Sequence, residues 1–379
     1  MRRRIKVASV LGAAALVGSS LGASAYASGP QQTARAGSVQ QQAPRLDHIF
    51  VIMLENHSQS SIIGDKNAPF INRLASNNAM ATHYYGVTHP SMPNYIAAIA
   101  GSSFGIQDDH DQNIVHLRKR NLVDQLEHHG VRWGAYMEDL PKDKLASFGP
   151  ANPSDPSKPY ALYAKKHNAF VLFDDVKNRP ARMRHVKDYS RLGHDLDSAH
   201  APRFVWISPN QCHDMHGGVT DHVAGHPETP CPYGGAKDDA NDAALKQKAD
   251  AFVRRAVHTI RGSQAWTRHS AIVIVTDEND YTGNRETGGW ESADGCCASP
   301  YIPKGDARVS SAWPGGTYGG GLIPAIIVSP AGRHHFVDHR KYNHYSLLRT
   351  VEENWHMARL RNAGDTVDGV RSMWHSFVR

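Results

Sequence analysis

The sequence predicts an α/β fold: a mostly parallel central sheet flanked by helices, in a sandwich. Three observations lead to that prediction. The chain has 379 residues, of which 40% are hydrophobic, so it can bury a large core. Four short apolar runs rich in β-branched residues have the character of buried strands, and segments with helical spacing separate them. Polar side chains follow directly after three of these runs, as they do where α/β sheets bind ligands.

The predicted strands and helices alternate along the chain. The strands are residues 48–54, 204–208, 271–276 and 324–329. The helices are residues 67–77, 94–100, 122–130, 238–260 and 344–355, and Gly130 is a common type of helix stop. No linker or shift in composition divides this region, so we expect residues 45–379 to form a single domain.

Residues 1–27 have the pattern of a secretory signal peptide. Four basic residues lie in positions 1–6, an apolar run of small residues follows over 7–21, and Ala-x-Ala sites end at residues 25 and 27. The apolar run is short for a bilayer, so we expect no stable membrane span. Residues 28–44, rich in Gln, Ala and Ser, predict a flexible leader. The protein is therefore expected to be secreted or held in the cell envelope, through the general secretory route or, given its arginine run, the twin-arginine route.

The charge of the chain argues against nucleic-acid binding. The formal net charge is +6, but four of the 42 basic residues and none of the 36 acidic ones lie in the signal, which leaves about +2. No basic stripe with interleaved aromatic residues occurs in the remainder.

Four cysteines are expected to form disulfides in an exported protein. Cys212 and Cys231 would close a short loop together. Cys296 and Cys297 are adjacent, and neighbouring cysteines rarely bond each other, so we expect one of them to find a more distant partner. The absence of Cys-x-x-Cys spacing disfavours a structural zinc site.

Acidic, amide and imidazole side chains gather after the predicted strands. Asp277 and Glu278 are adjacent carboxylates that repel each other unless a cation lies beside them, and a hard divalent ion would serve. Glu55 and Asn56 follow the first strand, where a simple Asn turn is the alternative. Asp214 and His216 lie in the segment after the second strand, and they combine carboxylate and imidazole donors that suit zinc, iron or manganese.

Ser91 is the candidate nucleophile. Pro90 and Pro93 bracket it, and the second proline would start a helix, whose free N–H groups favour phosphate. A plain helix cap is the alternative role for this serine. Residues 101–105 match the G-x-S-x-G nucleophile elbow, but a helix and not a strand precedes them, so we interpret them as a helix stop and loop.

Five segments, taken in order, resemble the phosphoesterase family of the alkaline phosphatase superfamily, which includes acid phosphatases and bacterial phospholipases C. The likeness extends from residue 48 to about residue 355. The segments are I-M-L-E-N-H-S (52–58), H-P-S-M-P-N-Y (89–95), S-P-N-Q-C-H-D-M-H (208–216), V-T-D-E-N-D (275–280) and N-H-Y-S-L-L-R-T-V-E (343–352).

The resemblance implies an alkaline-phosphatase-like sandwich and a metal-assisted reaction through a phosphoserine at Ser91. It implies one divalent metal ion, or two, and assigns the residues in three groups. A metal beside the nucleophile would be held by Glu55, Asn56, Asp277 and Glu278. Phosphoryl oxygens would be contacted by Asn94 and Asn56. A second metal or phosphate site would comprise Asp214, His216 and His344, with His216 or His344 as acid or base.

Two departures from the family pattern bear on the substrate. The Asp-His pair that many superfamily members have on the strand matching Asp277 and Glu278 is missing, which leaves the second metal open. The Phe-Asp that follows Glu-Asn-x-Ser in many phospholipases C is also missing, and no extra C-terminal domain is expected. The missing Phe-Asp and the expected lack of an extra C-terminal domain favour an acid-phosphatase-like phosphomonoesterase of small soluble esters. A phospholipase C-type phosphodiesterase acting on phospholipid and a non-catalytic secreted phosphate- or metal-binding protein are the alternatives.

Overall fold

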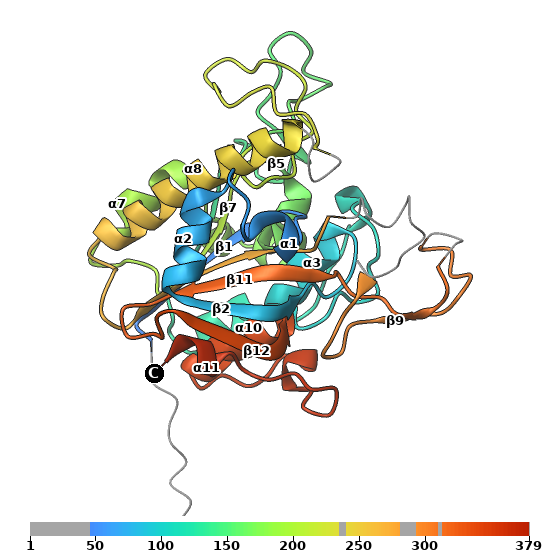
Figure 1. The fold of residues 1–379 in the computed structure, drawn as a ribbon. Coiled ribbons are helices and arrows are strands. Elements are labelled where there is room, and N and C mark those ends of the chain that lie inside the picture. Colours follow the sequence, from blue (N-terminus) through green and yellow to red (C-terminus); the bar gives the residue numbers. More distant parts are fainter. Residues whose placement is uncertain (1–45, 235–239, 281–292, 310–312, 379) are drawn as a thin grey trace, which may run out of the picture. The chain divides into compact units, whose positions relative to one another are not determined.

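The computed structural model describes residues 46–234, 240–280, 293–309 and 313–378 (Figure 1). The predicted signal peptide and leader lie outside these residues. An eight-stranded sheet forms the centre, in the order β12-β2-β11-β8-β1-β7-β3-β6. Its strands are β1 (His48–Leu54), β2 (Ala79–Tyr85), β3 (Trp133–Met137), β6 (Val186–Asp188), β7 (Phe204–Ser208), β8 (Ser270–Thr276), β11 (Leu322–Val328) and β12 (Phe336–Asn343). Two small ribbons pair β4 (Phe148–Gly149) with β5 (Tyr163–Ala164), and β9 (Tyr301–Ile302) with β10 (Gly316–Thr317).

The predicted fold class is confirmed, with one correction to strand direction. All pairs in the large sheet are parallel except those of β11, which runs antiparallel to both β2 and β8. The run at 324–329 was expected to be parallel like the others. Its apolar character specifies burial on both faces but not direction, so the sequence signal could not distinguish the two. The four predicted strands are β1, β7, β8 and β11, whereas β2, β3, β6 and β12 were not predicted.

Helices cover both faces of the sheet because successive strand residues point to opposite sides. On one face, Val51 and its equivalents pack against α3 (Ser91–Ala100), α4 (Leu122–His128) and α10 (His344–Asn354). On the other face, Ile52 and its equivalents pack against α2 (Pro69–Asn77), α7 (Leu192–Leu196) and α8 (Ala240–Gly262), as Figure 1 shows for α2 and α8. The shorter helices are α1 (Gln59–Ile62), α5 (Asp174–Lys177), α6 (Pro180–Met183) and α11 (Trp374–Phe377).

The long predicted helices are found within a few residues of their expected bounds, and α3 begins at Ser91, ahead of the expected residue 94. Gly101 ends α3 in the left-handed conformation, with φ of 71°, so the G-x-S-x-G segment does follow a helix. Asn343 caps α10, where its side chain accepts from the N–H groups of Tyr345 and Ser346. Within the described residues, no helix is both long and apolar enough to cross a bilayer.

The four cysteines form two disulfides. Cys212 and Cys231 form the expected disulfide in the loop after β7. Cys296 is bonded to the adjacent Cys297, which corrects the expectation of a more distant partner. The physical reason is that the first bridge already uses the other two cysteines, so no third thiol is left.

Candidate active site

Three adjacent strands deliver carboxylates to one edge of the sheet. Because β8, β1 and β7 are neighbours and parallel, the residues that follow them meet there. The backbone N–H of Asp277 donates to Leu54 O at 3.0 Å, and that of Glu55 donates to Asp214 O at 2.8 Å. The side chains of Glu55, Asp214, Asp277 and Glu278 are all buried. The structure thus brings together four carboxylates that the sequence marked at strand ends.

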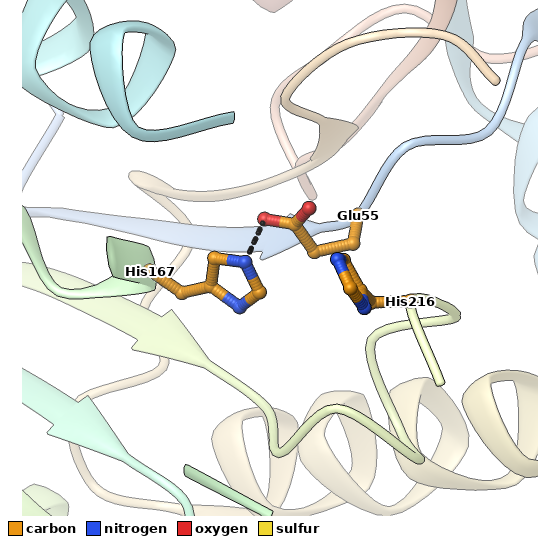
Figure 2. A group of neighbouring side chains, drawn as sticks. All are labelled: Glu55, His167 and His216. Carbon is orange, nitrogen blue, oxygen red and sulfur yellow. Dashed lines mark ion pairs between the residues drawn. The ribbon is translucent and has the colours of Figure 1, made fainter. Parts of the chain in front are cut away.

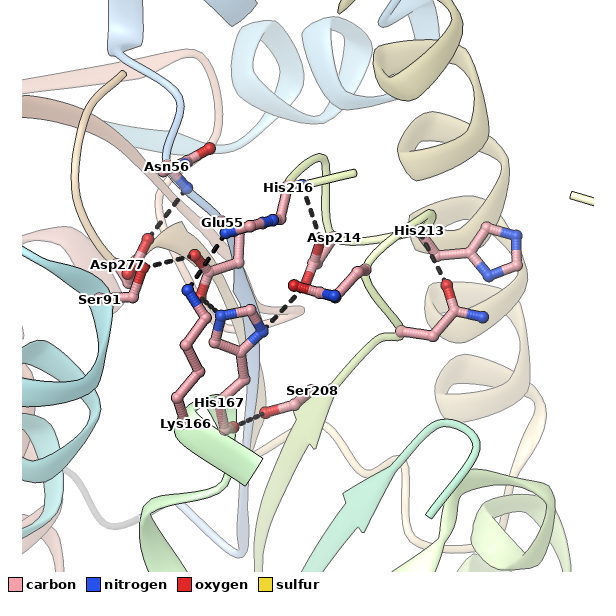
Figure 3. Close-up of polar contacts among 12 residues, drawn as sticks. Glu55, Asn56, Ser91, Lys166, His167, Ser208, His213, Asp214, His216 and Asp277 are labelled. Atoms are coloured by element: carbon pink, nitrogen blue, oxygen red, sulfur yellow. Dashed lines mark hydrogen bonds and ion pairs between the residues drawn. The ribbon is translucent and has the colours of Figure 1, made fainter. Parts of the chain in front are cut away.

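Ser91 lies at the first position of α3 with its side chain directed at two of these carboxylates. Its Oγ is 2.8 Å from Glu55 Oε2 (Figure 3) and 3.1 Å from Glu278 Oε1, so it can donate its proton to either. The second oxygen of Glu278 is ion-paired with His89. Glu55 and Glu278, which are 36 and 187 positions from Ser91 in the sequence, therefore both contact its hydroxyl.

Burial and mutual repulsion make Glu55 and Asp277 difficult to ionise. Burial raises the pKa of Glu55 to about 8, and the nearby charge of Lys166 opposes that shift. Burial, and then repulsion from Glu55 and Glu278, raises the pKa of Asp277 well above its ordinary range. Asp277 Oδ2 is buried without a hydrogen-bond partner among the described residues. Oxygen donors in this state fit a divalent cation, which would be held by Glu55, Asp277 and Glu278.

Asn56 contributes to the site through its backbone. Its N–H donates to Asp277 Oδ1 at 3.0 Å (Figure 3). The next residue, His57, is fixed on two sides: its Nε2 is 2.6 Å from Asp242 Oδ1, and its carbonyl accepts from Thr276 Oγ1 at 3.0 Å. These contacts hold the segment after β1 against the end of β8.

Two histidines lie beside Glu55 (Figure 2). His167 Nε2 is 3.1 Å from Glu55 Oε1, and its Nδ1 is 3.3 Å from Asp214 Oδ2. Glu55, His167 and His216 offer ligand atoms that all lie within 4.8 Å of one another. The other oxygen of Asp214 accepts from the His216 N–H at 2.7 Å. Burial lowers the pKa of His167 well below its ordinary range and that of His216 to about 3, so both rings are neutral at pH 7.

His344 lies in a different place from the one the sequence suggested. Its Nε2 is 2.6 Å from the backbone oxygen of Asp277, and its Nδ1 is 3.1 Å from the hydroxyl of Tyr84. With both ring nitrogens engaged, it supports the backbone of Asp277 and offers no ligand atom to a metal. In the expected grouping with Asp214 and His216, the third member is His167.

The side chain of Asn94, in α3, forms hydrogen bonds with the backbone of the loop before Ser91. Its Oδ1 accepts from the N–H groups of Val87 and Thr88, at 2.8 and 3.1 Å. Its Nδ2 donates to the carbonyls of Thr88 and Pro90, at 2.6 and 3.1 Å. The expected contact of Asn94 with phosphoryl oxygens therefore gives way to a role in shaping the loop that presents the serine.

Lys166 and Asp109 belong to the site although the sequence did not single them out. The Nζ of Lys166 is 2.8 Å from Asp109 Oδ2 and 3.2 Å from His216 Nε2. The other oxygen of Asp109 accepts from the N–H of Met92, beside Ser91. His167 was missed in the same way. All three lie in loops or a short 3₁₀ turn, outside the strands and helices that the sequence predicted.

Two glycines bring the serine loop close to the end of β8. Gly320 N donates to Gly86 O at 3.0 Å, and Gly86 N donates to Gly321 O at 2.9 Å. A Cβ atom on Gly86 would lie 2.8 Å from Asp277 O and from Gly320 Cα, and one on Gly320 would lie 2.6 Å from Thr88 O. Only residues without a side chain permit this approach.

Known proteins are similar to this chain in sequence. The model of the phosphoesterase family matches residues 65–228 and 232–358, well over half of the chain. A phosphatidylinositol-3-phosphatase of Mycobacterium tuberculosis is 32% identical over 265 residues, which cover 69% of this chain and 73% of that protein. A probable acid phosphatase of Kluyveromyces lactis (32% identical) and an acid phosphatase of Aspergillus fumigatus (33%) match 44% and 45% of this chain.

The matched segments span only 38% and 36% of the two fungal proteins. Among solved structures, a phosphonate monoester hydrolase of Agrobacterium radiobacter has a TM-score of 0.48 at 13% identity, over 82% of this chain and 74% of that one. The extent of the family match and the long match to the mycobacterial protein lead to one conclusion: the chain belongs to the phosphoesterase family.

Proposed function

We propose that the protein is a secreted, metal-assisted hydrolase of phosphoric esters that forms a phosphoserine at Ser91. The observation that supports this most directly is the position of the Ser91 hydroxyl, within hydrogen-bonding distance of Glu55 and Glu278 at the start of a helix. A hydroxyl held between carboxylates from two strand ends is arranged to lose its proton as it attacks phosphorus.

The residues of the chain can account for both halves of the reaction. In the first half, Ser91 Oγ bonds to phosphorus as its proton passes to Glu55 or Glu278, and the ester bond breaks as its oxygen takes a proton from solvent water. In the second half, water attacks the phosphoserine and passes a proton to His216 as the P–Oγ bond breaks, and Ser91 Oγ takes back the proton that Glu55 or Glu278 held. A divalent ion bound by Glu55, Asp277 and Glu278, with Asn56 beside them, would neutralise phosphoryl charge. These steps consume one water molecule and release an alcohol and phosphate.

Phosphate monoesters are the favoured substrates. The relatives matched here are named acid phosphatases and a phosphatidylinositol-3-phosphatase, and the sequence lacks the Phe-Asp pair common in phospholipases C. A diesterase of the phospholipase C type is the alternative activity, and a binding protein without turnover is the alternative class. The basic and apolar N-terminus supports export, as do two disulfides, which persist in oxidising compartments.

The test is hydrolysis of p-nitrophenyl phosphate by the purified protein, after removal of metals and return of single divalent ions. We expect metal-dependent turnover that Ser91→Ala reduces by more than about 10³-fold. Ser103→Ala, in the G-x-S-x-G segment, is the matched control and should keep full activity. Acid-quenched protein should carry phosphate on Ser91. Phosphate binding without turnover under every metal would overturn the proposal in favour of a binding protein.

A further inference from the structure

We propose that Lys166 is a further catalytic residue, whose ammonium group binds a non-bridging oxygen of a phosphate monoester dianion at Ser91. The inference rests on the proposed function, which it deepens by assigning a preference for monoesters over diesters to one side chain. Nothing in the sequence pattern marks this lysine, and its place in the site follows from the structure alone.

The first argument is position. Lys166 lies in the 3₁₀ turn Lys165–His167, and Figure 3 shows its side chain extended alongside His167 toward Glu55. Its Nζ is 3.2 Å from His216 Nε2, and a ligand atom of His216 is within 4.8 Å of one on Glu55. Glu55 in turn receives the Ser91 hydroxyl at 2.8 Å. Two side chains, His216 and Glu55, thus link the ammonium to the nucleophile.

The second argument is the way in which the ammonium is held. Asp109 accepts from Lys166 Nζ with one oxygen and from the Met92 N–H, at the start of α3, with the other. The lysine is therefore fixed relative to the helix that carries Ser91. An ammonium has three donors, and the described residues provide two hydrogen-bond partners, Asp109 and His216. The remaining donor is available to a ligand.

The third argument is charge. The site contains four buried carboxylates, and those that ionise to hold a metal would repel an incoming phosphate dianion unless several positive charges oppose it. A monoester dianion carries one more negative charge than a diester, on an oxygen that the diester uses to bind its second alcohol group. A fixed cation in addition to a divalent metal ion should therefore favour the monoester specifically.

The adjacent residue supplies a matched control. Lys165 also pairs with an aspartate, Asp111, with Nζ to Oδ2 at 2.5 Å, and it also donates to Leu145 O at 2.9 Å. Its side chain is about as buried as that of Lys166, at 14% exposed against 16%. Lys165→Gln therefore removes the same charge and a similar ion pair without touching the site.

The experiment measures kcat and KM for p-nitrophenyl phosphate and bis(p-nitrophenyl) phosphate in the metal-loaded protein. We expect Lys166→Gln to lower kcat/KM for the monoester by about 10²-fold or more, and that for the diester by less than about 10-fold. Lys166→Arg, which keeps the charge and the pair with Asp109, should recover part of the monoester activity. Lys165→Gln should behave as the unmodified protein. Equal losses on both esters, or an equal effect of Lys165→Gln, would overturn the assignment in favour of a structural role.

Binding of inorganic phosphate separates this inference from the proposed function. Calorimetry should show that Lys166→Gln weakens phosphate binding by about 10-fold or more, whether or not the protein turns over esters. Binding that depends on Lys166 in a protein without turnover would retain the lysine site and refute the hydrolase. Turnover with phosphate binding indifferent to Lys166 would refute the lysine and retain the hydrolase. Absence of both turnover and phosphate binding in the unmodified protein would refute both.

Discussion

The Nε2 atom of His344 lies 2.6 Å from the backbone oxygen of Asp277, which joins the start of α10 to the end of β8. His344→Ala would leave that buried oxygen without its donor and the Tyr84 hydroxyl without its acceptor. We expect the free energy of unfolding to fall by about 2 to 4 kcal/mol in urea titrations, through the lost hydrogen bonds and the cavity.

His344→Ala also tests whether His344 supports the backbone of Asp277 or binds a metal ion. Because both ring nitrogens of His344 already have partners, the number of divalent ions bound per chain should be unchanged in folded His344→Ala. Tyr84→Phe, which keeps the contact with Asp277, should cost only about 1 kcal/mol. Loss of bound metal by a folded His344→Ala protein would return this residue to the ligands.

Asp277→Asn combined with Glu278→Gln should abolish metal binding, since it removes two of the three carboxylates that converge beside Ser91. Dialysis against each divalent ion followed by elemental analysis measures the loss. In the metal-free state the double variant should be more stable than the unmodified protein at pH 7, because it no longer carries buried carboxylates that repel each other. Asp280→Asn, a carboxylate in the same loop that accepts from the Ser58 N–H, is the control and should retain metal. Unchanged stoichiometry in the double variant would refute the assigned ligands.

Glu352 predicts a pH-dependent stability far from the site. It is buried, with Oε1 accepting from the Leu360 N–H at 2.7 Å, and burial raises its pKa from 4.5 to about 7. Between these values the folded protein keeps a proton that the unfolded chain releases, so the free energy of unfolding falls as pH rises from 4.5 to about 7. Glu352→Gln should remove this fall and be more stable at pH 8 by about 3 kcal/mol, with no advantage at pH 4.

Urea titrations at pH 4, 6 and 8 measure this difference, and Glu353→Gln provides the contrast. The pKa of Glu353 is lowered, because Ser372, Arg359 and Arg349 outweigh its burial. Its replacement should therefore reduce stability at pH 8 and have little effect at low pH. Parallel curves for Glu352→Gln and the unmodified protein would contradict the prediction.

Lys246 is fully buried and holds two carboxylates together, at 2.6 Å from Asp242 Oδ2 and 3.1 Å from Asp65 Oδ2. Lys246→Met leaves those charges buried with less compensation, so we expect a loss of about 3 to 5 kcal/mol in the free energy of unfolding. Lys248→Met, on the same helix, removes only a hydrogen bond to Pro230 O and should cost less than about 1 kcal/mol. Equal stabilities of the two variants would show that the buried network contributes little.

The sequence allowed prediction of the parts of the site that directly follow a strand. Glu55, Asp277 and Glu278 come just after continuous apolar runs, so their common edge followed from the geometry of parallel strands. The nucleophile candidate came from the proline-bracketed segment and from its family resemblance. These are local patterns, which a single sequence displays.

The rest depends on contacts between distant segments. The direction of β11 is set by its neighbours β2 and β8, and not by its own residues. The family resemblance grouped His344 with Asp214 and His216, but its two ring nitrogens contact Asp277 O and the Tyr84 hydroxyl. Lys166 acquires its position from Asp109, and no pattern within a short window records a pairing across 57 residues.

The Gly86–Gly320 contact has a consequence for how the site tolerates change. The spacing between the nucleophile loop and the metal-side carboxylates is set there by one main chain lying on another, with no side chain to act as an adjustable spacer. A single methyl group on Gly86 or Gly320 would push the nucleophile loop away from the segment that carries the other glycine. Such a protein could keep every chemically active group and its sheet, and still hold the serine at the wrong distance from its partners.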